Sequence, residues 1–447
     1  MRIFDVQEFI DRQTISRAQL TVLALATLLM FIDGFDIFMV GKIAPAIAKD
    51  FGVSPAQLTL VFLLQQTGLA VGAFFISPLS DYLGRKRMLL AFSLIFGVLT
   101  ALTALSTSIT MLAIFRGVAA LFLAGVLPAA VALVAEFTPK VRRSTFIAFG
   151  IAGYSAGSAA GASMALLVPD YGWQVAFWIG GAMPLLLAPI IWRWLPESLA
   201  FRVNCDPHDP VIAQTIRRID PQEKLVGDER FVVDAAGGTA KRKVDVLDVF
   251  REGRARTSII VFAACVLSMG NIALLAAWLP TFFQEMGGIS IQRFAIAAMI
   301  GFMGGLAGTM TIGFLMDRIR PTILIPIYYI GLAASLLLMG KIPFGTPAFI
   351  ALLIFWSFCQ SGGQAGINML MAQVYPAEIR STGIGWAGGA GRIGGVIAPL
   401  FGGLAVAQMF NLTLTLSLIA ILPLLVAILI AFLGRGGATA TPATAAA

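Results

Sequence analysis

The chain has 447 residues, of which 58% are hydrophobic and only 12% are charged. Soluble globular proteins carry about 25% charged residues, so this composition excludes an ordinary soluble domain and favours a protein surrounded by lipid. The net charge of +8 at pH 7 does not indicate a nucleic-acid partner, because most of the basic residues lie between the apolar stretches and gather on one side of them.

Apolar runs of about 20 residues, the length that crosses a bilayer as a helix, recur twelve times along the chain. They predict membrane helices at about 18–44, 56–80, 88–108, 110–136, 144–168, 173–195, 257–283, 291–316, 321–340, 346–373, 381–408 and 411–433. The predicted fold is therefore an all-α integral membrane protein with twelve transmembrane helices.

The basic residues are distributed unequally over the two sides of these helices. If the N-terminus is cytoplasmic, the outer side holds only Lys42, Lys49, Arg293 and Lys341. Arg116 and Arg392 lie inside helices, and the rest of the 31 lysines and arginines fall on the inner side. This positive-inside asymmetry predicts that both termini are cytoplasmic.

The sequence contains no recognisable catalytic or metal-binding set. Its three cysteines are scattered, and the lone His208 lies in a polar interval, so neither a disulfide framework nor a metal site is expected. No Ser/His/Asp set or phosphate-binding loop is evident, and we expect neither enzymatic activity nor a cofactor.

The longest polar interval divides the predicted helices six and six. The expected organisation is a cytoplasmic tail (1–17), a six-helix half (18–195), a cytoplasmic linker with one or two short surface helices (196–256), a second half (257–433) and a disordered tail (434–447). The halves repeat, since Pro139, Arg143, Ser144 and Thr145 recur at one offset as Pro376, Arg380, Ser381 and Thr382. Parallel six-helix repeats are one way to build a transporter.

Two segments resemble the loop signature of the major facilitator superfamily. The segment from Ser77 to Arg87 (SPLSDYLGRKR) is similar to the loop between helices 2 and 3, although Ser77 replaces the usual glycine. The segment from Gly313 to Arg318 (GFLMDR) is similar to the copy in the second half. The resemblance covers nearly the whole chain and implies the major facilitator fold.

A narrower resemblance is to the aromatic acid:proton symporters, bacterial inner-membrane importers of benzoate-type compounds. It is carried by DGFD (33–36), YPAEIRSTG (375–383) and GWAGGAGRIGG (385–395). It implies a multi-pass inner-membrane protein that imports an acid such as a hydroxybenzoate, protocatechuate, gentisate or vanillate in symport with protons. We expect a monomer without a nucleic-acid partner.

Asp33 and Asp36 lie in the middle of the first apolar run. A carboxylate at a helix centre costs about 2.5–3.5 kcal/mol, so two of them indicate a function. Three residues apart, they share one helical face and are predicted to titrate as a coupled pair. We expect at least one to carry the proton, the alternative being a permanently charged partner for an arginine.

The intramembrane arginines, Arg116 and Arg392, are candidate substrate ligands, because a guanidinium binds a carboxylate through two parallel hydrogen bonds. Each can instead form a structural ion pair, and Arg116 in particular can pair with an acid of helix 1. Polar amides in apolar runs are expected to orient the substrate ring: Asn271, Gln360, Gln364 and Asn368.

A set of charges near the cytoplasmic helix ends is predicted to form an inner gate that breaks and reforms as the halves rock. Its members are Asp81, Arg85, Glu136, Arg143, Asp317 and Arg380.

Other functions stay open at this point. The chain could carry another organic acid or a sugar, or act as a proton-coupled efflux antiporter. Against efflux, Gly157 is followed by Ser158 and Ala159, whereas the superfamily's antiporters usually have a Gly-Pro pair in helix 5. A non-transporting aromatic-acid sensor would be favoured by a large signalling domain, which the sequence lacks.

Overall fold

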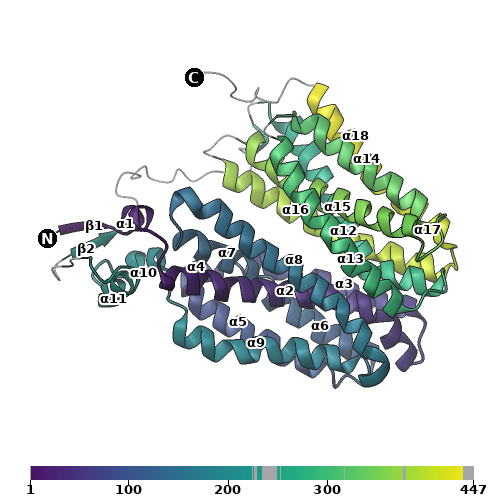
Figure 1. Cartoon of the computed structure of the whole chain (residues 1–447), viewed down its shortest axis with the longest axis horizontal. Helices are drawn as coiled ribbons and strands as arrows, with labels where there is room; N and C mark the ends of the chain where they lie inside the picture. Colours follow the sequence, from purple (N-terminus) through teal and green to yellow (C-terminus); the bar gives the residue numbers. More distant parts are fainter. Residues whose placement is uncertain are drawn as a thin grey trace. The chain divides into compact units, whose positions relative to one another are not determined.

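The computed structural model describes residues 2–223, 225, 229–233, 249–251, 253–316, 318–375 and 379–435 (Figure 1). Within them, twelve helical segments are long and apolar enough to cross a membrane. The predicted all-α membrane fold with twelve transmembrane helices is confirmed. The predicted disordered tail lies almost wholly outside the described residues.

The first six spans are α2 (Arg17–Asp50), η1 with α3 (Pro55–Leu58 and Thr59–Phe75), α5 (Arg85–Thr103), α6 with α7 (Ile109–Leu123 and Val126–Glu136), α8 (Lys140–Tyr171) and α9 (Gln174–Trp194). A short α4 (Leu79–Leu83) precedes α5. The last six are α12 (Ala255–Glu285), α13 (Ile291–Met316), α14 (Pro321–Met339), α15 (Pro347–Val374), α16 (Arg380–Ala407) and α17 with α18 (Leu412–Ile419 and Ile421–Arg435).

The bounds of several spans differ from the predicted ones by up to about six residues, and three differences are described below. α2 continues to Asp50, several residues beyond its predicted end. The fourth and twelfth spans are each divided in two, because Pro128 and Pro423 stand in the first turns of α7 and α18. Proline has no N–H to donate to the preceding turn, so it is tolerated at a helix start and interrupts a continuous helix.

The chain forms two compact units. The first comprises Met1–Met39, Thr67–Gly161 and Gln174–Ala240, and the second comprises Val40–Gln66, Ala162–Trp173 and Lys241–Ala447. The far ends of α2 and α8 and the start of the second span are therefore grouped with the second unit. The sequence-based halves, 18–195 and 257–433, stay a prediction.

A small extramembrane module belongs to the first unit. β1 (Arg2–Asp5) pairs in parallel with β2 (Glu229–Val232), with Phe4 opposite Phe231. The module also contains α1 (Val6–Arg12) and two short helices of the predicted linker, α10 (Leu199–Cys205) and α11 (Pro210–Ile219). The strand pairing was not predicted, because four-residue strands so far apart along the chain leave no periodic signal.

Glycines bring α2 and α8 into backbone contact within the first unit. A Cβ placed on Gly34 would overlap the carbonyl oxygen of Tyr154, and one placed on Gly157 would overlap that of Phe31. Small residues permit such close approach between membrane helices. This contact fixes the depth and rotation of the stretch of α2 that carries Asp33 and Asp36.

We expect Gly157→Ala to destabilise the protein by about 1–3 kcal/mol, because the added methyl group forces α2 and α8 apart. Gly388→Ala is the matched control, since nothing lies within 4 Å of a Cβ at that position. Thermal unfolding of the two purified variants in detergent measures the difference. Equal melting temperatures for both would show that the α2–α8 contact is not tightly packed.

Candidate functional site

A buried ion pair joins α2 to α6 inside the first unit. Arg116 donates from Nη1 to Asp36 Oδ1 at 2.9 Å and from Nη2 to Oδ2. Both side chains are 0% exposed. The guanidinium also lies 5.6 Å from the ring centroid of Phe177 on α9, so three helices enclose it. Arg116 was predicted either to bind substrate or to pair with an acid of helix 1. The structure shows the second contact, with Asp36.

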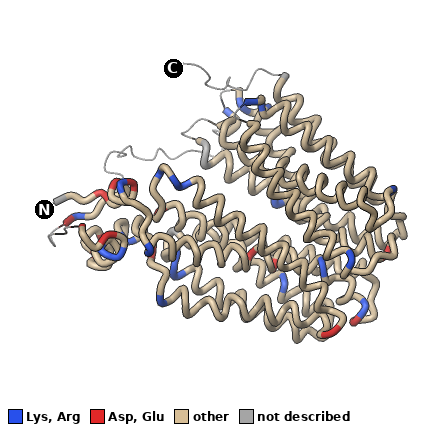
Figure 2. Tube along the Cα trace, in the orientation of Figure 1, with Lys and Arg blue, Asp and Glu red and all other residues tan. Residues whose placement is uncertain are grey.

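Asp33 lies one helical turn before this pair and is also buried, with 3% of its surface exposed. In the same stretch α2 meets α8, where Phe38 and Tyr154 pack edge to face with ring centroids 6.1 Å apart. The two acids therefore share a buried part of α2, and Arg116 binds the second of them through both oxygens. Figure 2 shows how rarely charges interrupt the middle of the helices.

The predicted amides form a polar cluster in the second unit. Asn271 on α12 donates to Gln360 Oε1 on α15 at 2.7 Å, and Gln364 donates to Asn368 Oδ1 at 3.3 Å. Ser268 donates to Gln364 Oε1 at 2.5 Å and lies 2.5 Å from the Tyr329 hydroxyl.

Ser268 and Tyr329 are members of this cluster that sequence reasoning missed. Ser268 lies three residues before Asn271, so a polar stripe on the seventh span was a usable signal. Tyr329 gave no signal, because a tyrosine in an apolar run is also typical of interfacial and core positions.

Two polar atoms of the cluster are buried without a hydrogen-bond partner among the described residues: Asn271 Oδ1 and Gln360 Nε2. An amide–amide pair leaves one acceptor and one donor unused, whichever way the two amides are turned. Buried polar groups without partners are uncommon in native proteins, and a bound ligand or water is a usual reason for them.

Arg392 is half-buried on α16 in the second unit. The structure gives its guanidinium neither a hydrogen bond nor an ion pair with any described residue. There is space beside the helix, because nothing lies within 4 Å of a Cβ at Gly385 or Gly388. A charged group in a membrane span without a protein partner is a candidate ligand-binding group.

The predicted gate charges are partly brought together at one end of the first unit. Arg85 binds Glu136 at 2.9 Å and donates to the Ser198 hydroxyl at 2.7 Å, while Ser198 donates to Glu136. Ser198 was not among the predicted gate residues. It is the N-cap of α10, and a serine ahead of a short helix is explained by that role alone.

Arg143 does not join this group. Its Nη2 lies 3.7 Å from Oδ1 of Asp11 on α1 and donates a hydrogen bond to the backbone oxygen of Thr138. Asp317 and the side chains of Asp81 and Arg380 fall outside the part of the chain that the structure describes.

Lys42, predicted to lie on the outer side, is half-buried in α2, and its Nζ lies 5.4 Å from the ring centroid of Phe294. Its side of the membrane stays a prediction. The cation–π contact accounts for the orientation of its ammonium group.

Comparison with known proteins gives the family. Residues 26–399 and 261–446 match the model of the Major Facilitator Superfamily. The chain belongs to this superfamily. The prediction of a transporter rather than an enzyme is thereby confirmed.

Several named transporters are similar to this chain. A gallate transporter of Pseudomonas putida is 30% identical over 99% of this chain and 98% of its own length. The 4-hydroxybenzoate transporter PcaK of Acinetobacter baylyi is 31% identical over 93% of this chain and 91% of its own. Among solved structures, a bacterial homologue of the human lysosomal transporter Spinster aligns with a TM-score of 0.71 and 16% identity over 96% of this chain and 100% of its own, which shows the shared fold.

Removing one partner of the Asp36–Arg116 pair should be far more damaging than removing both. Asp36→Asn leaves a buried guanidinium without its counter-ion and should cost about 3–5 kcal/mol of stability. The double variant Asp36→Leu/Arg116→Met should recover most of that loss, because it buries apolar groups instead. Asp170→Asn, at an exposed position, is the control.

Thermal unfolding and the yield of monodisperse protein measure these effects. A double variant no more stable than Asp36→Asn would contradict the assignment of a mutually compensating pair.

Proposed function

We propose that this superfamily member imports an aromatic carboxylate together with protons across the bacterial inner membrane, with both termini in the cytoplasm. The observation that carries the proposal is Arg392, a half-buried guanidinium without a counter-ion among the described residues, in a chain about 30% identical to relatives named for gallate and 4-hydroxybenzoate. The benzoate transport protein of Acinetobacter baylyi, 28% identical over 96% of this chain and 93% of its own, adds to this support.

In this proposal Arg392 binds the substrate carboxylate. A guanidinium offers two parallel N–H donors that match the two carboxylate oxygens, and its charge compensates the anion inside the membrane. Arg116 is less suited to this role, because Asp36 already occupies the same donors.

The amide cluster would orient the aromatic ring. Asn271 and Gln360 retain one acceptor and one donor between them. A hydroxyl on the ring can both donate and accept, so it can satisfy both atoms at once. Ser268 and Tyr329 hold the neighbouring Gln364 in place and would limit how the ring can turn.

We infer that Asp33, rather than Asp36, carries the proton. Protonating Asp36 would leave Arg116 charged and uncompensated in a site where both side chains are 0% exposed. Asp33 is the other buried acid of the same stretch, and it is close enough along α2 for its charge to be coupled to that of Asp36.

The Arg85–Glu136–Ser198 group is proposed as part of the inner gate. Its hydrogen bonds tie the start of α5 to the end of α7 and to the loop that connects α9 with α10. In an alternating-access cycle these contacts would break and reform. Asp81, Arg143, Asp317 and Arg380 stay predicted members of the gate.

Uptake by cells or proteoliposomes tests the proposal as a whole. A panel of benzoate derivatives is offered with an inward proton gradient, with and without an uncoupler. We expect hydroxylated benzoates to accumulate, and the uncoupler to abolish the accumulation. If none of the acids accumulates, or if accumulation is insensitive to the gradient, the proposed function is wrong.

Asp33→Asn should lower gradient-driven accumulation at least tenfold, because the amide cannot bind and release a proton. Exchange of labelled for unlabelled substrate, which needs no net proton movement, should persist. Asp170→Asn serves as the control for the same chemical change at an exposed site. Unchanged gradient-driven accumulation in Asp33→Asn would rule Asp33 out as the proton carrier.

Arg392→Gln should weaken 4-hydroxybenzoate binding by about tenfold or more, which corresponds to about 1.4 kcal/mol. Arg392→Lys should recover only part of the affinity, because a lysine cannot make the paired hydrogen bonds. Arg320→Gln removes an exposed arginine and is the control. Calorimetric titration of purified protein measures the affinities, and equal values for wild type and Arg392→Gln would remove Arg392 from the site.

A further inference from the structure

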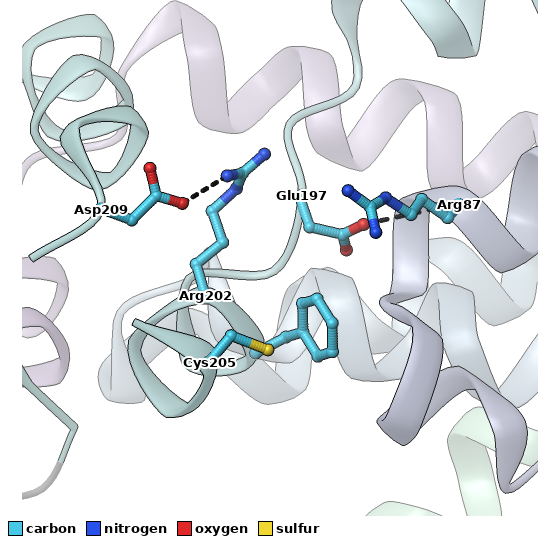
Figure 3. A pocket seen from close by; sticks show the side chains of 6 residues that line it. Arg87, Glu197, Arg202, Cys205 and Asp209 are labelled. Carbon is cyan, nitrogen blue, oxygen red and sulfur yellow. Dashed lines mark hydrogen bonds and ion pairs between the residues drawn. The ribbon is translucent and has the colours of Figure 1, made fainter. Parts of the chain in front are cut away.

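A cleft of about 160 Å³ lies at the start of α5 in the first unit, next to the Arg85–Glu136–Ser198 group and lined by none of the residues proposed to bind substrate or proton. It is lined by Arg87, Glu197, Phe201, Arg202, Cys205 and Asp209. In Figure 3 the guanidinium groups of Arg87 and Arg202 extend into the space on either side of Glu197.

The two acids of the cleft are already engaged. Glu197 is 6% exposed and caps α5, since Oε1 accepts from the backbone N–H of Lys86 at 2.9 Å and Oε2 from that of Arg87 at 3.4 Å. Asp209 accepts from Arg202 at 2.6 Å and from the backbone N–H of Val211 at 2.9 Å. Asp209 therefore compensates Arg202, and the carboxylate of Glu197 is the one negative charge of the lining that faces the other cations.

The cations of the cleft outnumber these acids. Arg202 and Arg218 both lie close enough to Lys86 to repel its ammonium group, and Glu197 attracts it. Arg87 is exposed, and its guanidinium has no acid partner among the described residues. We call Lys86, Arg87, Arg202 and Arg218 the cationic cluster. Four positive charges therefore lie around two carboxylates, an excess of two positive charges.

The cluster lies at the depth of lipid headgroups. α5 and α9 run side by side (Figure 1), and Trp192 and Trp194 near the end of α9 are 69% and 58% exposed. Exposed tryptophans at the end of a membrane helix mark the interface between the acyl chains and water. Lys86 donates from Nζ to the backbone oxygen of Trp192 at 2.8 Å, which places the cluster at that level.

We propose that the cationic cluster binds the phosphate of an anionic phospholipid in the leaflet at this end of the helices. The phosphate supplies the negative charge that the cleft lacks, and the exposed tryptophans beside it contact the glycerol and upper acyl region. Tyr82 and Leu83 of α4, 81% and 49% exposed, extend the apolar surface near the start of α5. A lipid bound here contacts the helix whose first residue, Arg85, holds Glu136.

The site is independent of the transported substrate, so its test needs no transport. Purified full-length protein is titrated with phosphatidylglycerol, and with phosphatidylcholine of the same acyl chains, and bound lipid is counted by native mass spectrometry. We expect phosphatidylglycerol to be retained at least tenfold more tightly. Inorganic phosphate and glycerol 3-phosphate are added as competitors to distinguish a lipid site from a site for free phosphate.

Two matched double variants localise the effect. Arg87→Gln/Arg218→Gln removes two exposed cluster charges and should weaken phosphatidylglycerol retention at least fivefold. Arg318→Gln/Arg320→Gln removes two exposed arginines from the second unit and should leave it unchanged. The proposal is overturned if the two double variants behave alike, whether both retain the lipid or both lose it. It is also overturned if millimolar soluble phosphate displaces the lipid.

Discussion

The ion pair between Asp36 and Arg116 is the constraint around which the first unit is arranged. Two full charges, both at 0% exposure, are tolerable only as a pair bound through two hydrogen bonds, so α2 and α6 must keep one relative rotation. The backbone contacts of Gly34 and Gly157 then set the position of α8 against the same stretch of α2. Together these contacts determine where Asp33 lies, which makes the position of the proposed proton carrier a consequence of a structural ion pair.

The two intramembrane arginines illustrate how surroundings assign different roles to one side chain. Arg116 is enclosed by α2, α6 and the ring of Phe177, with its donors to Asp36 occupied. Arg392 is half-buried beside glycines that leave space next to it. The first arrangement satisfies the charge within the protein, and the second gives it no counter-ion among the described residues. The chemistry proposed for transport rests on this difference.

Sequence reasoning located the helices well because bilayer thickness imposes a length on every span, and it selected Asp33, Asp36 and the arginines because charge in lipid is costly. It could not choose the partner of Arg116, since Asp36 is 80 residues away and helix rotation decides the contact. It missed Ser268, because a single hydroxyl in an apolar helix costs little. The three-residue spacing between Ser268 and Asn271 was the usable signal, and the contact with Gln364 depends on where the neighbouring helix lies.

The pairing of β1 with β2 brings the beginning of the chain to the polypeptide that comes after the sixth span. The first six spans lie along the chain between these two strands, which form hydrogen bonds to each other. A break in the polypeptide between 234 and 248 would therefore leave both strands, and the sheet that they form, on one fragment.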